Sequence, residues 1–162
     1  MVTVRIESPA NPDAVALVEE LDAYQKPLYP EESFYGIDLA EMLQPNVIFA
    51  MARMPDGAAA GCGAVVITEE GWGELKRMFV RPDLRGRGVA QAVVSFLEGE
   101  AMRRGVDVMR LETGISQPEA LRFYEQAGYV RRGVFGRYAN DPLSVFMEKR
   151  LVRKMQREET NP

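Results

Sequence analysis

A glycine-rich turn flanked by arginines is the segment whose residue types point most directly to chemistry. It reads Arg-Pro-Asp-Leu-Arg-Gly-Arg-Gly-Val-Ala over residues 81–90, between a predicted strand and a predicted helix. Gly86 and Gly88 lack side chains, so backbone N–H groups of the turn can face a ligand. The N-terminus of the following helix adds unpaired donors and a partial positive charge. This combination predicts a site for a pyrophosphate group.

Two familiar nucleotide-binding patterns do not account for this turn. The dinucleotide fingerprint G-x-G-x-x-G would need a third glycine where Gln91 stands. The sequence also contains no G-x-x-x-x-G-K-[ST] motif, so a P-loop is excluded. A nucleotide-binding α/β domain therefore ranks low among the functional alternatives, and a surface turn with solvated arginines is the structural alternative.

The absence of histidine limits the acid–base chemistry. A Ser-His-Asp triad, a Cys-His dyad and a histidine-based zinc site are excluded, because the chain has no histidine and one cysteine, Cys62. A general acid or base must then be a Glu, Asp, Tyr, Lys or Cys side chain. Cys62 lies between two glycines in a predicted strand and is expected to be a small buried hydrophobic residue. We expect no metal cofactor.

The composition is typical of a globular protein. Its 162 residues suit one domain, with 46% hydrophobic and 27% charged residues. The net charge of −4 argues against binding of nucleic acid or of anionic membranes. No apolar run approaches the ~18 residues that would span a bilayer, and residues 1–5 do not resemble a signal peptide. We expect a cytoplasmic protein with one domain over residues 1–151 and a polar tail over 152–162.

Hydrophobic periodicity predicts a strand, two helices, three strands and then alternating helices and strands. Strands are expected at 2–6, 47–53, 60–67, 74–80, 106–112, 129–135 and 144–151. Helices are expected after Asn11-Pro12, at 38–44, at 88–104 ending at Gly105, and at 116–128, where Ser116 and Glu119 form a capping box. The fold class is α/β: a mixed, mostly antiparallel sheet of about seven strands flanked by about four helices.

Two separated motifs carry a resemblance to a known family. Arg85, Gly88 and Ala90 fill the pattern [Q/R]-x-x-G-x-[G/A], and residues 80–85 fill the lead-in V-x-P-x-x-R. Further along, residues 120–129 read Ala-Leu-Arg-Phe-Tyr-Glu-Gln-Ala-Gly-Tyr, an A-x-x-x-Y-x-x-x-G-[F/Y] segment. The chain therefore resembles the GNAT family of N-acetyltransferases, most closely from residue 74 to residue 129, and is similar to its small bacterial members.

The resemblance implies acetyl-CoA as the cosubstrate and a primary amine as the acceptor, with direct attack in a ternary complex. The backbone of residues 85–90 would hold the pyrophosphate. Implied cofactor contacts are Met78, Phe79, Val80, Arg85, Gly86, Arg87, Gly88, Val89, Ala90, Gln117 and Tyr124. Gln117 departs from the pattern, because many members have asparagine at this position. Dimers are common in the family, so a homodimer is one expectation.

Tyr124 is the implied acid that protonates the leaving thiolate, although it also suits a core position on its helix. An alkylammonium acceptor has a pKa near ~10.4 and must lose a proton before it attacks. Glu74 is the first candidate for the base and Glu112 the second, each acting through water. Either carboxylate could instead have a structural role, Glu74 as an exposed strand-end charge and Glu112 as the partner of an arginine.

The acceptor site is expected between the segment after the first long helix and the last hairpin. Tyr29, Glu32, Phe34 and Tyr35 form an aromatic and acidic group, and Tyr138 lies in the hairpin. Aromatic rings and carboxylates suit a cationic amine. The main functional alternative is a non-catalytic module on the same fold that binds or senses acyl-CoA. A free-thiol release assay would separate the two.

Overall fold

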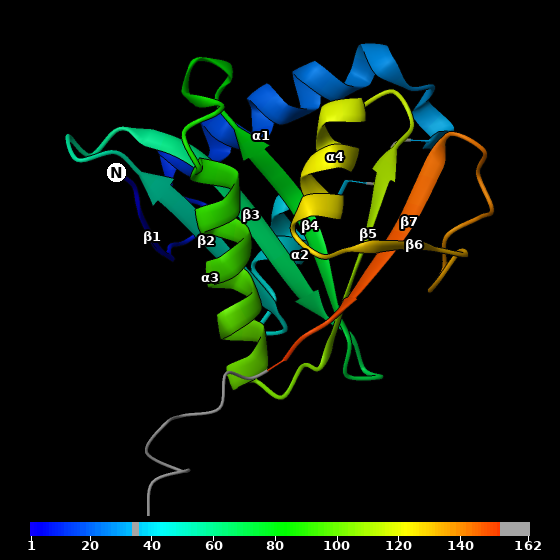
Figure 1. Ribbon diagram of the computed structural model, residues 1–162. Coiled ribbons are helices and arrows are strands. Elements are labelled where there is room, and N and C mark those ends of the chain that lie inside the picture. The colour runs from blue at the N-terminus through cyan, green and yellow to red at the C-terminus, as the bar shows by residue number, and fades with distance from the viewer. Residues whose placement is uncertain (34–35, 153–162) are drawn as a thin grey trace, which may run out of the picture.

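The computed structural model describes residues 1–33 and 36–152, which form one α/β domain around a seven-stranded sheet (Figure 1). The strands are β1 (Thr3–Ile6), β2 (Val47–Arg53), β3 (Ala59–Ile67), β4 (Gly73–Val80), β5 (Val108–Gly114), β6 (Val130–Arg132) and β7 (Ser144–Arg150). The helices are α1 (Pro12–Gln25), α2 (Leu39–Met42), α3 (Val89–Arg103) and α4 (Pro118–Gln126). The predicted fold class is confirmed.

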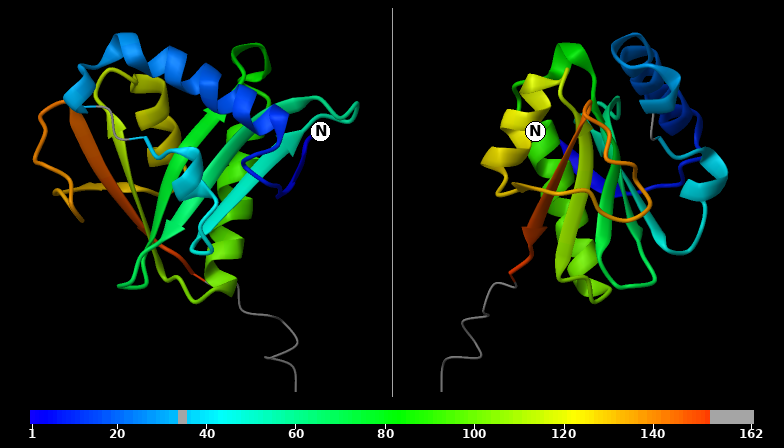
Figure 2. Two further views of the ribbon diagram at one scale, coloured as in Figure 1. Left: turned by 180° about the vertical axis from the view of Figure 1, so that it is seen from behind. Right: turned by 90° about the vertical axis from the view of Figure 1, so that its right-hand side faces the viewer.

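The sheet opens between the adjacent strands β4 and β5. The strand order is β1-β2-β3-β4-β5-β7-β6, and every neighbouring pair is antiparallel except β4 and β5. These two parallel strands pair only where Gly73–Leu75 meets Met109–Leu111. Beyond this point they diverge, as Figure 1 and the left view of Figure 2 show. The divergence leaves backbone and side chains of β4 and β5 open to a ligand.

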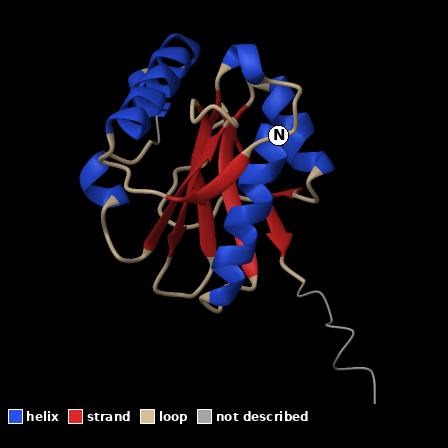
Figure 3. Cartoon of the chain, turned by 90° about the vertical axis from the view of Figure 1, so that its left-hand side faces the viewer, coloured by secondary structure: helices blue, strands red, loops and turns tan. Residues whose placement is uncertain are grey.

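Helices cover both faces of the sheet. Helices α1 and α2 lie on one face, whereas α3 and α4 lie on the other (Figures 2 and 3). Strand β2 shows the alternation that this requires, because Phe49 and Met51 belong to the buried cluster under α1, whereas Ile48 and Ala50 belong to the cluster under α3. The sheet is thus buried on both sides and provides a rigid support for the site.

The two helices nearest the opening end in the same way. The N–H of Val106 donates to the carbonyl of Ala101, and the N–H of Tyr129 donates to the carbonyl of Tyr124. In each case the preceding glycine, Gly105 or Gly128, has a positive φ, so both ends are Schellman motifs. The following strands therefore begin later than predicted, at Val108 and Val130, because the intervening residues close the helices.

The predicted capping box of α4 is wrong. Gln117, not Ser116, is the N-cap residue, and its side chain makes no capping hydrogen bond. The N–H of Gln117 instead donates to the carbonyl of Gly114 in a tight turn that directly follows β5. The side chain of Gln117 is thereby available to the opening between β4 and β5.

A β-bulge in β4 shapes the edge of the opening. Cys62 of β3 pairs with Phe79, but Ala64 pairs with Lys76, so β4 carries one extra residue at this position. Arg77 lies in the bulge with a φ of 57°. Its guanidinium donates two hydrogen bonds to the carbonyl of Ile37 and one of 2.6 Å to Asp22. The bulge thus fixes α1 and the segment before α2 against the open strand.

Candidate active site

Two cavities meet where β4 and β5 separate. The larger is a cleft of about 780 Å³ between β4, the glycine-rich turn and α4. The smaller is a pocket of about 120 Å³ between β4, β5 and the loops on the α1 side. Five residues line both cavities, namely Leu21, Met78, Gln117, Ala120 and Tyr124. A ligand in the cleft can therefore present its end to a second molecule in the pocket.

The glycine-rich turn offers its backbone amides to the cleft. Within the described part of the chain, no acceptor is recorded for the backbone N–H groups of residues 86–90. Gly86 and Gly88 have φ angles of 79° and 80°, and the positions of their absent Cβ atoms face open space. Gly88 is the N-cap of the 15-residue helix α3 and supplies no capping side chain. These features fit an anion such as a diphosphate.

Most of the residues expected to contact the cofactor lie in the cleft wall, from β4, the turn and α4. Met78, Phe79, Val80, Arg85, Gly86, Gly88, Val89, Ala90, Gln117 and Tyr124 line it. Arg87 is exposed at the turn and lies outside this lining. Arg85 is held by a hydrogen bond from its Nε to the carbonyl of Val80, with its guanidinium 5.5 Å from the ring centre of Tyr24.

Glu74 lies in the small pocket with two partners. The hydroxyl of Tyr138 donates to its carboxylate, and the ammonium of Lys76 lies 3.4 Å from the same oxygen. Lys76 also donates to the hydroxyl of Tyr138 at 2.5 Å. Edge-to-face contacts with Phe135 and Phe146 hold the Tyr138 ring. Glu74 is 8% exposed, so it is a buried group rather than an exposed strand-end charge.

Glu112 is the second carboxylate in the pocket wall. Burial raises the pKa of Glu112 above its ordinary value, which a hydrogen bond of 2.7 Å from the Ser144 hydroxyl opposes. Lys76 also lowers the pKa of Glu112, whereas Glu74 and Asp141 raise it. No arginine is recorded as its partner within residues 1–33 and 36–152, so the structural alternative for Glu112 does not hold there.

Two loops form the outer wall of the pocket. Tyr29 follows α1, and its hydroxyl donates to the side-chain oxygen of Gln117 at 3.1 Å. Burial raises the pKa of Tyr29, although hydrogen bonds with Ser116 oppose this effect. The hydroxyl of Ser33 donates to Asp141 at 2.5 Å and so joins this segment to the loop between β6 and β7.

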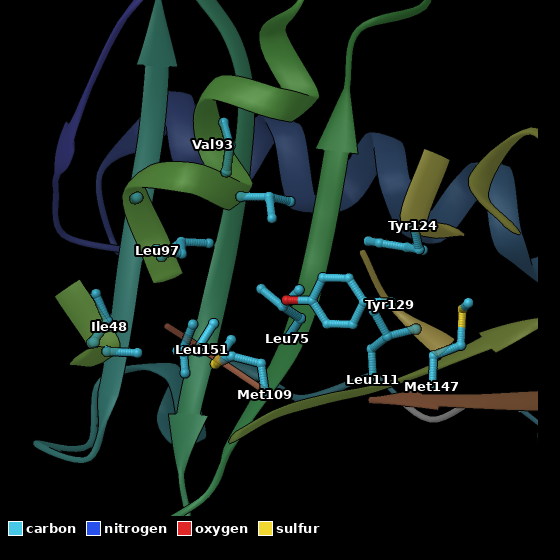
Figure 4. Close-up of a cluster of buried hydrophobic side chains, with 14 of the residues drawn as sticks. Ile48, Leu75, Val93, Leu97, Met109, Leu111, Tyr124, Tyr129, Met147 and Leu151 are labelled. Atoms are coloured by element: carbon cyan, nitrogen blue, oxygen red, sulfur yellow. The ribbon is translucent and has the colours of Figure 1, made fainter. Parts of the chain in front are cut away.

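Tyr124 lies at the junction of the two cavities and is also part of the core (Figure 4). It is 8% exposed and makes edge-to-face contacts with Phe123 and Tyr129. Burial raises the pKa of Tyr124, so its hydroxyl stays protonated at neutral pH. Tyr124 can therefore belong to both the core and the site, because one edge packs against Phe123 and Tyr129 and another faces the cavities.

The structure brings together some of the residues expected at the acceptor site. Tyr29 and Tyr138 line the small pocket. Glu32 is exposed in a short helix and does not line the pocket, whereas its neighbour Ser33 does. Tyr35 and Phe34 lie outside the described residues. The sequence analysis missed Lys76, although its spacing of two from Glu74 on one strand places both side chains on one face.

Other features bear on cofactors and reactivity. Cys62 is fully buried, and burial raises the pKa of its thiol to about 12, so it is not a nucleophile at neutral pH. Within the described ranges, no cluster of three metal-ligating side chains occurs. None of the helices in those ranges has the length and apolar character needed to cross a membrane.

Comparison with known proteins agrees with this geometry. The model of the acetyltransferase (GNAT) family matches residues 14–129. The IAA acetyltransferase of Azospirillum brasilense is 44% identical over 151 residues, which are 93% of this chain and 98% of that protein. A solved Klebsiella pneumoniae structure, described as a candidate acyl-CoA N-acyltransferase, has a TM-score of 0.84 and 40% identity, covering 94% of this chain and 99% of the other.

The chain belongs to the acetyltransferase (GNAT) family. It is an acetyl-CoA-dependent acetyltransferase, as the resemblance implied. The paia N-acetyltransferase of Thermoplasma acidophilum, solved in complex with coenzyme A, has the same fold, with a TM-score of 0.72 at 18% identity over 93% of this chain and 99% of that one. The unpaired amides of residues 86–90 and the size of the cleft fit the diphosphate and arm of such a cosubstrate.

Proposed function

We propose that the protein transfers the acetyl group of acetyl-CoA to the primary amine of a small-molecule acceptor, by direct attack while both are bound. The observation that carries this proposal is the shared wall of the two cavities, with Tyr124 at their junction. A donor in the cleft and an acceptor in the pocket would meet there without a covalent enzyme intermediate. The buried thiol of Cys62 supports the same conclusion, because it offers no alternative nucleophile.

Bound acetyl-CoA would supply the activated acetyl thioester. The amides of residues 86–90 hold its diphosphate, helped by the positive end of the α3 dipole. The unpaired edge of β4 from Met78 to Val80 hydrogen-bonds the extended arm in the manner of an added strand. A backbone N–H next to the bulge at Arg77 polarises the acetyl carbonyl and stabilises negative charge on its oxygen.

The acceptor ammonium must lose a proton to become a nucleophile. The contacts favour Glu112 over Glu74 for this step and so reverse the order expected from the sequence. Glu74 is engaged by Tyr138 and Lys76, whereas Glu112 accepts from a neutral hydroxyl and has a raised pKa. A carboxylate with a raised pKa is the better base near neutral pH.

The amine nitrogen then forms a bond to the acetyl carbon, the nitrogen passes its second proton to water, and the carbon–sulfur bond breaks. The leaving thiolate takes the proton of the Tyr124 hydroxyl, and the proton on Glu112 passes to water. Tyr124 recovers its proton from solvent, so acetyl-CoA and amine yield CoA and amide. The protonated hydroxyl of Tyr124 at the junction of the two cavities supports its role as the acid, whereas its raised pKa makes it a weaker acid than a free tyrosine.

A thiol-release assay with acetyl-CoA and a panel of primary amines tests this proposal. IAA is assayed as a separate acceptor outside the panel, because the Azospirillum relative is named for it. We expect CoA release that depends on an amine, together with an acetylated amine identified by mass spectrometry. Thermal stabilisation by acetyl-CoA without release for any acceptor would contradict the proposal and favour a binding or sensing module.

A further inference from the structure

We propose that the acceptor is a compact amine without an acidic group, namely a short alkylamine that carries a hydroxyl group or a second ammonium. This inference rests on the proposed function and adds the substrate class. It depends on three properties of the small pocket: its size, the balance of charge in its wall, and the hydrogen-bonding role of the atoms that line it.

The pocket is small relative to the cleft beside it. Its volume is about 120 Å³, against about 780 Å³ for the cleft. An amine with a chain of about three carbons and one further polar group matches this space. The hydrogen bond between Ser33 and Asp141 joins the two loops at the outer wall of the pocket, so an acceptor that fills the space between these loops would have to break it.

Carboxylates outnumber ammonium groups around the pocket. Glu74 and Glu112 line it together with one ammonium, that of Lys76. The guanidinium of Arg77 also lies in the wall, but Asp22 balances its charge at 2.6 Å. Asp141 lies close enough to raise the pKa of Glu112 and so adds negative charge behind the wall. The wall therefore attracts a cation and repels a carboxylate.

Strand register explains why these charges face one space. Glu74 of β4 lies opposite Arg110 of β5, so both side chains lie on one face of the sheet. Lys76 and Glu112, each two residues further along, lie on that same face. Arg110 lies outside the pocket lining and shares Glu148 with Arg132, at 2.8 and 2.5 Å. Two carboxylates and one ammonium thus gather where the two strands separate.

The carboxylates and the Ser33 hydroxyl of the wall act as acceptors toward a ligand, whereas the amide group of Gln117 can still donate. The hydroxyl hydrogen of Tyr29 is used on Gln117, and that of Ser33 is used on Asp141. The Ser33 oxygen can then accept hydrogen bonds, as the two carboxylates do, whereas the Tyr29 oxygen already accepts from Ser116. An acceptor molecule that brings further donors, such as a hydroxyl or an ammonium, satisfies this wall. A carboxylate on the acceptor molecule would place its oxygen atoms, which only accept hydrogen bonds, against wall oxygens that also accept them.

Four amines of equal chain length test the inference. The full chain is assayed at saturating acetyl-CoA with 3-amino-1-propanol, 1,3-diaminopropane, propylamine and β-alanine, which differ only at the end remote from the reacting amine. We expect kcat/KM for the amino alcohol and the diamine to exceed that for β-alanine by at least about tenfold, because like charges oppose each other in a partly buried wall. Calorimetric binding of each amine in the presence of CoA should give the same order.

Charge variants link the selectivity to the wall. Asp141→Asn should reduce the preference for the diamine over β-alanine about threefold, and Lys76→Met should increase it. Glu70→Gln, which changes an exposed turn residue outside the pocket lining, should leave the ratio unchanged. Because the readout is a ratio between two acceptors, a general loss of activity or stability does not affect it.

The outcomes separate this inference from the proposed function. Equal or better turnover of β-alanine would overturn the substrate class while leaving amine acetylation intact, and so would turnover of bulky amines alone. If acetyl-CoA binds but no amine is acetylated, the proposed function fails first. An unchanged ratio in Asp141→Asn and Lys76→Met would show that the wall does not set the selectivity.

Discussion

The hydroxyl oxygen of Tyr29 lies 1.6 Å from the position that a Cβ atom would occupy on Gly114. The end of β5 therefore requires glycine, because any side chain there would displace the ring that closes the acceptor pocket. We predict that Gly114→Ala moves Tyr29, breaks its hydrogen bond to Gln117 and raises the KM for the amine about tenfold. Steady-state kinetics with the amine varied at saturating acetyl-CoA measure this change.

A second glycine variant provides the control. Gly99 lies within α3 with no atom near its absent Cβ, so Gly99→Ala should stabilise the helix by ~0.5–1 kcal/mol and leave the amine KM unchanged. Acetyl-CoA should still raise the melting temperature of Gly114→Ala. If the amine KM of Gly114→Ala equals that of the unchanged protein, Tyr29 has no part in acceptor binding.

The amides before α3 give a second prediction. Gly88→Glu places a carboxylate where the diphosphate is expected, so it should abolish the thermal shift that acetyl-CoA produces. It should also destabilise the fold by ~1–3 kcal/mol, because φ is 80° at this position. Thermal unfolding with and without acetyl-CoA separates the two effects, since only the difference between the two temperatures reports binding.

Gly105 supplies the matched control for Gly88. It lies at the opposite end of α3 with a φ of 87° and open space around its absent Cβ. Gly105→Glu should therefore show a similar loss of stability but keep the full shift with acetyl-CoA. If acetyl-CoA raises the melting temperature of neither variant, then strain in α3 prevents binding, rather than the new carboxylate at the diphosphate position.

Tyr124 carries the third prediction. Tyr124→Phe should lower kcat by about 100-fold or more, because protonation of a leaving group by a positioned acid contributes on this scale. Acetyl-CoA binding should persist, since the ring contacts with Phe123 and Tyr129 need no hydroxyl. Normal kcat in Tyr124→Phe would assign the residue to the core alone.

Tyr129→Phe distinguishes a catalytic hydroxyl from a structural one. The Tyr129 hydroxyl donates to buried Glu98 at 2.8 Å, and Lys149 donates to the same carboxylate. Its removal should lower the free energy of unfolding by ~1–3 kcal/mol, because Glu98 loses a partner. Urea denaturation measures this loss, and kcat well below the melting temperature should change little.

Local signals in the sequence predicted most of the fold. The glycine-rich turn was recognisable because positive φ and a helix N-terminus leave a local signature. Alternation and helical spacing likewise located the main elements. The boundaries at Val108 and Val130 were missed, because hydrophobic residues that close a Schellman motif look like the first residues of a strand. The predicted capping box at Ser116 and Glu119 is wrong, because the tight turn after β5 places the N-cap at Gln117.

The candidate site was harder to predict, because it depends on distant pairs. Lys76 reaches Tyr138 across 62 positions of sequence, and Ser33 reaches Asp141 across 108. No local pattern encodes such contacts, so the sequence suggested Glu32 where Ser33 lines the pocket. The separation of β4 from β5 was also hidden, since it follows from a pairing that ends at Leu75 and Leu111.

Glu112 supplies the last prediction, in which stability and activity change in opposite directions. Burial raises the pKa of Glu112 above 4.5, so the folded protein binds this proton more tightly than the unfolded chain does. The ionised carboxylate therefore costs stability at every pH above its raised pKa, and this cost disappears as the pH falls toward 4.5. Glu112→Gln keeps an oxygen that accepts from Ser144 and removes the charge.

Glu112→Gln should thus melt at a higher temperature than the unchanged protein at pH 8, and the difference should shrink to nothing near pH 4.5. Its kcat should fall by about 100-fold, because the amide cannot accept the acceptor's proton. Glu74→Gln should lose less of its kcat if Glu112 is the base. Thermal unfolding from pH 4.5 to 8, together with kcat at pH 8, measures both effects. A lower melting temperature for Glu112→Gln at pH 8 would contradict the linkage, and a larger loss of kcat in Glu74→Gln would return the role of base to Glu74.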